Sequence, residues 1–138
     1  MTARRFALVL AGLAAAALSA CGDAGMGVAP EAPRPGELTV SLATPFPDDR
    51  AVLITVTGPD EATAVADAGS GYSVHARTGG TSFRAAVFGR ISSGPLVRFT
   101  VPDVGRASAY RATVQEVVDP ASSVRSSTSG YVLTISRK

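Results

Sequence analysis

The sequence comprises 138 residues, which is enough for one ordinary domain and little else. Hydrophobic residues make up 46% and charged residues 17%, a globular composition that excludes a fibrous or wholly disordered chain. Two of the 13 lysines and arginines are Arg4 and Arg5, so the rest of the chain balances its 11 carboxylates and gives no sign of a nucleic-acid-binding surface. One cysteine and one histidine exclude an intrachain disulfide and a Cys/His zinc cluster.

Residues 1–20 have the organisation of a secretory signal peptide. Arg4 and Arg5 precede an apolar stretch that runs from Phe6 to Ala20 and ends in small residues. As a helix this stretch would span about 22 Å, which is less than the hydrocarbon core of about 30 Å. We therefore expect a cleaved leader rather than a transmembrane anchor.

The chain's one cysteine follows this stretch directly, in the sequence Leu18-Ser19-Ala20-Cys21. These residues resemble the lipobox of bacterial lipoproteins, in which a leucine and two small residues precede an invariant cysteine. The resemblance implies that a type II signal peptidase cuts before Cys21 and that Cys21 is the lipidation site, carrying a diacylglyceryl group and often a third chain such as palmitate. Two or more chains anchor a protein firmly, whereas one binds only marginally.

Gly22 stands after the cysteine, where an aspartate would retain a lipoprotein in the inner membrane of enteric-type bacteria. The resemblance therefore implies a location in the cell envelope, on the outer membrane or on the outer face of the cytoplasmic membrane, with the domain in the periplasm or at the cell surface. An ordinary signal peptide with a chance cysteine at its end is the alternative. Residues 21–37 are expected to be the lipidated cysteine and a flexible linker, because proline and glycine recur there without apolar periodicity.

Residues 38–138 are expected to form one all-β domain. Apolar side chains recur at every second position in six segments, as in strands with one buried face: 38–43, 52–56, 72–77, 83–88, 96–101 and 131–135. The segment 108–117 alternates and then changes phase, which predicts a β-bulge near Gln115 and Glu116. The segment 62–68 is either an edge strand or a short helical turn.

Seven or eight such strands predict an antiparallel β-sandwich, Ig-like or cohesin-like. Val87-Phe88-Gly89 and the segment from Ser93 to Phe99 resemble the paired strands of cohesin-type and carbohydrate-binding sandwich modules. The resemblance supports the sandwich fold and assigns no docking residue.

The domain offers few residues for catalysis. A nucleophile needs a nearby base, and the mature chain has His75 and Lys138 but no Gly-x-Ser-x-Gly motif. The acidic residues beside proline or glycine are expected to be turn formers and solubilising charges: Asp48, Asp49, Asp60, Glu61, Asp67, Asp103 and Asp119. A loose calcium site among these carboxylates stays open. We otherwise expect no catalytic residue, metal ligand or cofactor.

The sequence also predicts the surroundings of His75. Thr78-Gly79-Gly80-Thr81 separates two alternating segments, which predicts a type I′ hairpin loop at Gly79-Gly80. This register pairs Ala76 with Phe83 on the buried face. On the other face it places His75 opposite Arg84, so His75 is expected to face solvent as neither a base nor a metal ligand.

Together these features favour a membrane-anchored, non-enzymatic lipoprotein whose sandwich binds a protein partner or has a structural role. The alternative is a carbohydrate-binding module with a polysaccharide partner, which would need an exposed aromatic strip. The chain has no tryptophan, and its three tyrosines fall on the faces expected to be buried: Tyr72, Tyr110 and Tyr131. A hydrolase is a third interpretation and would need a cleft with converging carboxylates.

Overall fold

The computed structural model of the protein describes residues 27–138, so the predicted signal peptide, Cys21 and the first part of the predicted linker lie outside the described residues. Residues 27–35 are exposed and carry no regular element. One compact unit spans Ala32–Lys138. Its elements in chain order are β1 (Gly36–Ala43), β2 (Asp49–Thr57), β3 (Thr63–Asp67), β4 (Ser73–Gly79), β5 (Ser82–Ile91), β6 (Gly94–Val101), the 3₁₀ helix η1 (Val104–Ala109), β7 (Arg111–Val118) and β8 (Val132–Arg137).

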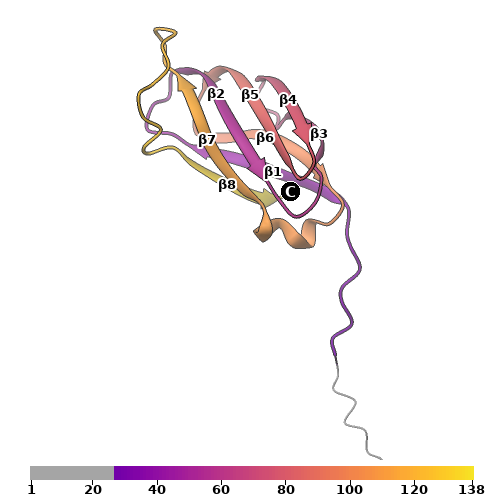
Figure 1. Cartoon of the computed structure of the whole chain (residues 1–138). Helices are drawn as coiled ribbons and strands as arrows, with labels where there is room; N and C mark the ends of the chain where they lie inside the picture. Colours follow the sequence, from indigo (N-terminus) through magenta and orange to yellow (C-terminus); the bar gives the residue numbers. More distant parts are fainter. Residues whose placement is uncertain (1–26) are drawn as a thin grey trace, which may run out of the picture. The chain divides into compact units, whose positions relative to one another are not determined.

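The strands form two four-stranded antiparallel sheets packed face to face (Figure 1). One sheet has the order β3-β6-β1-β8 and the other β4-β5-β2-β7. The predicted all-β sandwich is confirmed, and the ambiguous segment 62–68 is the edge strand β3, which pairs with β6. β1 begins at Gly36, two residues before the expected domain boundary, because Gly36 and Glu37 already pair with β6. Within residues 27–138 no helix is long and apolar enough to cross a membrane.

The inward side chains of both sheets meet in one core. Phe83 of β5 and Phe99 of β6 come from opposite sheets and pack edge to face, with ring centroids 5.1 Å apart. Both are at most 2% exposed, and burying such a side chain stabilises a fold by about 1.5–3 kcal/mol. Since alternation sends every second side chain outward, each sheet also presents an outer face.

β7 contains the predicted bulge. Leu53 of β2 lies opposite Glu116, whereas the next residue, Ile54, lies opposite Val114. Gln115 is therefore the extra residue, as expected where two residues of one strand oppose one of its partner. The bulge restores the phase of β7, so that Val117 is fully buried.

The β4–β5 hairpin differs from the predicted one. Gly79 pairs with Ser82, so the loop is Gly80-Thr81 and the predicted loop is wrong. Gly80 has a φ of 58° while Thr81 has no positive φ, which is the pattern of a type II′ turn rather than type I′. The partner of each β4 residue moves by two positions, so every side chain keeps its predicted face. His75 is exposed as expected, but it lies opposite Ala86 instead of Arg84.

Candidate functional site

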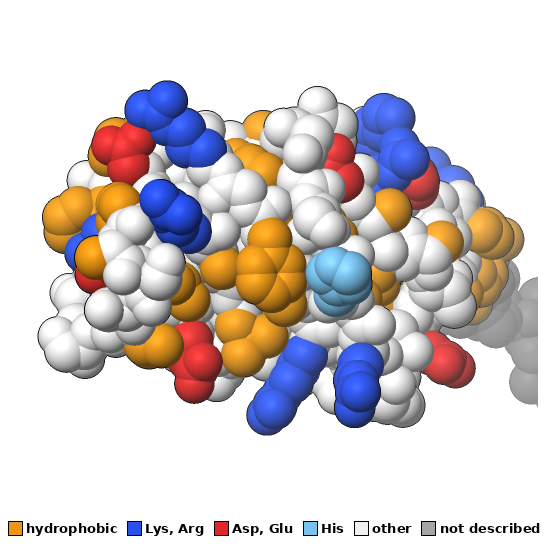
Figure 2. Space-filling view, turned by 90° about the horizontal axis from the view of Figure 1, so that it is seen from above, with side chains coloured by type: hydrophobic (Ala, Val, Ile, Leu, Met, Phe, Trp, Pro, Cys, Tyr) orange, Lys and Arg blue, Asp and Glu red, His pale blue; other side chains and the backbone are white. Residues whose placement is uncertain are grey.

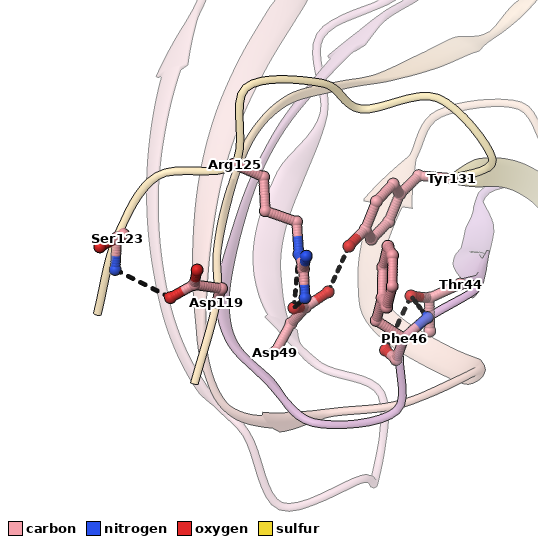
Figure 3. A network of polar contacts seen from close by, with 7 residues as sticks. All are labelled: Thr44, Phe46, Asp49, Asp119, Ser123, Arg125 and Tyr131. Carbon is pink, nitrogen blue, oxygen red and sulfur yellow. Dashed lines mark hydrogen bonds and ion pairs between the residues drawn. The ribbon is translucent and has the colours of Figure 1, made fainter. Parts of the chain in front are cut away.

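Asp49 is a fully buried carboxylate at the start of β2. Its Oδ1 accepts hydrogen bonds from Nε and Nη2 of Arg125, at 2.8 and 2.6 Å, and its Oδ2 accepts one from the hydroxyl of Tyr131 (Figure 3). The expectation of a solubilising turn charge is therefore wrong for Asp49. A buried charge needs partners, and these partners stand 76 and 82 residues further along the chain.

The loop between β7 and β8 supplies both partners. The backbone N–H of Arg125 donates to the carbonyl of Val117 at 2.8 Å, and Val124 forms an isolated bridge with Val118. The carboxylate of Asp119 accepts a hydrogen bond from the N–H of Ser123 at 3.0 Å. These contacts fold the loop back onto β7, so that the guanidinium of Arg125 reaches Asp49 (Figure 3).

Phe46 packs over this ion pair. Its ring centroid lies 3.9 Å from Cζ of Arg125, a cation–π geometry, and 6.3 Å from the ring of Tyr131. The hydrogen bond to Asp49 raises the pKa of Arg125, and burial together with the hydrogen bond to Asp49 raises the pKa of Tyr131 to about 12. Arg125 thus stays charged and Tyr131 neutral at ordinary pH. Because their polar atoms are used within the group, we assign the group a structural role.

Other acidic residues act as turn formers, as predicted. Oδ1 of Asp103 accepts the N–H groups of Arg34 and Gly105, at 3.2 and 2.8 Å, and these hydrogen bonds lower the pKa of Asp103. Asp67 accepts two backbone N–H groups in the same way. The carboxylates do not converge on a cleft, and the described part of the chain holds no group of three or more His, Cys, Asp or Glu that could bind a metal.

The outer face of the sheet β4-β5-β2-β7 carries cationic and apolar side chains in register. One row across the sheet is His75, Ala86, Leu53 and Glu116; the next is Arg77, Arg84, Thr55 and Thr113. Phe88 belongs to the row before them. Five of these side chains line an open depression extending over β4 and β5, and Phe88 lies against His75 beside it. We refer to these six side chains as the β4–β5 face: Leu53, His75, Arg77, Arg84, Ala86 and Phe88.

Two like charges oppose each other on this face. Arg77 lies directly opposite Arg84, and both are exposed. Residues flanking a two-residue loop form a hydrogen-bonded pair and such pairs alternate, so these two Cα atoms lie about 5.5 Å apart. Like charges in this position destabilise a sheet. Among residues 27–138 neither guanidinium makes an ion pair, and Glu116, on the same face, is two strands away from Arg84.

His75 and Phe88 form the apolar part of the face. Their rings pack edge to face with centroids 5.8 Å apart, and Nε2 of His75 lies 3.2 Å from Oγ of Ser73. Phe88 is 47% exposed. Figure 2 shows the histidine against a hydrophobic side chain, with cationic side chains nearby. Among the described residues no carboxylate contacts His75; its neighbours are the Ser73 hydroxyl and the Phe88 ring.

The tyrosines do not form the exposed row that a sugar-binding surface would need. Tyr110 is buried against Phe99, with ring centroids 5.7 Å apart. Tyr72 and Tyr131 are half-buried, and the hydroxyl of Tyr131 is bonded to Asp49.

No protein-family model, curated protein or solved structure matches this chain. The two outer faces of the sandwich can still be compared with each other. The outer face of β1 and β8 carries neutral pairs such as Ser41 with Thr134, and Arg98 of β6 has Glu37 within 3.9 Å. Directly opposed cations that make no ion pair within residues 27–138 distinguish the β4–β5 face from it, and this face is the candidate binding site.

Replacing Arg125 with methionine would leave the buried Asp49 carboxylate without its counter-charge. Removing one partner of a buried pair is strongly destabilising, so we expect the Tm to fall by at least about 10 °C in calorimetry. Arg90→Met is the matched control, since Arg90 pairs with Asp48 on the surface; its Tm should change by no more than about 2 °C. Equal losses in the two variants would contradict the buried pair.

Tyr131 should make stability fall steeply at alkaline pH. The folded protein holds the phenol proton up to about pH 12, whereas the unfolded chain loses it near 10.0. This contribution is therefore complete below pH 10 and is lost as the pH rises through 12. Tyr131→Phe should be less stable at neutral pH but have a flatter dependence in this window, measured by urea denaturation. Tyr110, whose pKa burial also raises, is present in both proteins; an unchanged slope would contradict the assignment.

Proposed function

We propose that the protein is a lipid-anchored lipoprotein of the bacterial cell envelope, whose sandwich binds a protein partner through the β4–β5 face and performs no catalysis. The binding role is carried by the pair of Arg77 and Arg84, two exposed cations placed directly opposite each other without an ion-pair partner in the described structure. Repulsion between them weakens the free sheet. A partner that brings carboxylates would relieve this repulsion. The free energy that the repulsion costs the unbound sheet would then be recovered on binding.

The anchor rests on the lipobox resemblance of Leu18-Ser19-Ala20-Cys21. Residues 22–35 supply 14 residues between Cys21 and β1, and such a chain reaches about 43 Å when stretched at about 3.1 Å per residue. The domain would then stand clear of the headgroups, on the outer membrane or on the outer face of the cytoplasmic membrane. The exposed Phe88 beside His75 fits a protein partner, because aromatic residues and arginine are enriched in protein interfaces.

The anchor is tested by Cys21→Ser in the native host. Wild-type protein should fractionate with membranes and carry a lipid mass on an N-terminal Cys21, read by mass spectrometry of the mature chain. The variant lacks the thiol that is acylated, so it should remain unprocessed or leave the membrane fraction. A Cys21→Ser protein that is processed normally and stays membrane-bound would show that the anchor assignment is wrong.

The binding face is tested by photo-crosslinking in native membranes. Phe88 is replaced by photoreactive benzoyl-phenylalanine, and Val132 serves as the matched control because it is 54% exposed on the outer face of the other sheet. We expect one discrete protein adduct from position 88 and none from position 132. The adduct should disappear in the double variant Arg77→Gln/Arg84→Gln. Adducts of equal yield at both positions, or adducts to lipid alone, would refute binding through this face.

A further inference from the structure

We infer that the open edge of β4 binds an extended, acidic segment of the partner as an additional strand. This inference rests on the proposed function, since it names the chemistry of the partner at the same face. Strand addition uses backbone hydrogen bonds for affinity and alternate side chains for specificity. Both requirements can be compared with β4 residue by residue.

β4 is the most open of the four sheet edges. It pairs with β5 over seven residues without a register shift, and each of its residues except Val74 is exposed. The edges β3 and β7 are interrupted by register shifts, and β8 is contacted by η1 as well as by β7. Bulges and short strands are usual protections of an edge, and β4 has neither of these, although β3 of the other sheet lies against it.

The hairpin geometry shows which backbone groups of β4 are free. Gly79 and Ser82 flank the two-residue loop and form a hydrogen-bonded pair, so the residues at alternate positions from Gly79, including Arg77 and His75, also bond to β5. The N–H and C=O groups of the intervening residues must then point to the open edge. Those residues are Val74, Ala76 and Thr78.

Side chains of an added strand would alternate between two environments. On the outer side they would lie next to His75 and Arg77, where the unpaired cations of the β4–β5 face favour glutamate or aspartate. On the inner side they would lie next to Val74 and Ala76. Ala76 faces the core side yet is exposed, so a small apolar side chain there would extend the core. The partner segment therefore alternates acidic and apolar residues.

An anionic membrane surface would also be attracted to these cations, but it would leave the open backbone edge unused. The two occupants make different demands. A lipid surface requires only charge, whereas strand addition requires free N–H groups in both chains and one alternating order of side chains.

The test uses the mature chain with Cys21→Ser and a capped peptide of about seven residues in which glutamate alternates with valine, matching the length of β4. Three control ligands accompany it: a peptide of the same composition with its glutamates in one block, the alternating peptide with alternate amides N-methylated, and phosphatidylglycerol vesicles. Binding is measured by calorimetry, and amide exchange by NMR. We expect the alternating peptide to slow exchange at Val74, Ala76 and Thr78, and to bind at least about tenfold more tightly than the block peptide.

Two variants test the contacts. Arg77→Gln/Arg84→Gln should weaken peptide binding at least about tenfold, while Arg98→Gln/Arg137→Gln, with the same charge change on the other sheet, should not. Ala76→Pro removes one free-edge N–H and is compatible with an edge strand, so it should abolish the exchange protection. N-methylation of the peptide should do the same without altering the protein, which covers a variant that fails to fold.

Three outcomes would each overturn strand addition: tighter binding to vesicles than to the alternating peptide, a block or N-methylated peptide that binds as tightly as the alternating peptide, or no binding of the alternating peptide. If the photo-adduct at position 88 nevertheless depends on Arg77 and Arg84, the proposed binding face stands without it. Loss of both results would remove the proposed function as well.

Discussion

The charge of Asp49 imposes the strictest constraint on this fold. A carboxylate with no exposure to water is tolerable only if hydrogen-bond donors and a counter-charge surround it. Arg125 and Tyr131 meet that demand from the last quarter of the sequence, so the loop between β7 and β8 cannot leave β2 without exposing or orphaning the charge. The contact joins the strand at the centre of one sheet to the chain segment that enters the edge strand of the other. One ion pair thus determines how the two sheets are closed at this end.

The presence or absence of a carboxylate partner also explains why Arg125 differs in role from Arg77 and Arg84. The guanidinium of Arg125 donates to Asp49 from Nε and Nη2 and is covered by Phe46, so its charge is already compensated within the fold. The guanidinium groups of Arg77 and Arg84 face solvent with no carboxylate to neutralise them in the described structure. Arginine suits planar, bidentate recognition of carboxylates. The balanced net charge of the chain conceals this local excess, because total charge says nothing about where charges gather.

Much of the fold could be predicted because apolar residues at every second position of a strand all lie on one face, which is the face that the sheet buries. The bulge at Gln115 could be located because Val114 and Val117 cannot both point inward on a regular strand. The register of the β4–β5 hairpin could not be predicted, because a loop at Gly79-Gly80 and one at Gly80-Thr81 both have two residues and both place His75 outward. Backbone twist and the φ of Gly80 decide between them, and these are properties of the paired strands. Hence the face of Arg77 and Arg84 was predictable, but their direct opposition was not. Asp49 left no local signal, because its partners are distant in sequence and it looks like any turn aspartate.

The position of Arg77 on the edge strand β4 also affects how two copies of the protein meet. Under the proposed lipid anchor, molecules on one membrane would be confined to two dimensions, where identical domains meet far more often than in solution. An open edge under those conditions would ordinarily pair with the same edge of a neighbouring copy. Here that encounter brings the Arg77 guanidinium of one molecule towards that of the other, and β4 and β5 carry no acidic side chain to oppose them. Because the two guanidinium groups repel each other, β4 disfavours pairing with β4 of a second copy, although its edge would accept the acidic segment of the proposed partner.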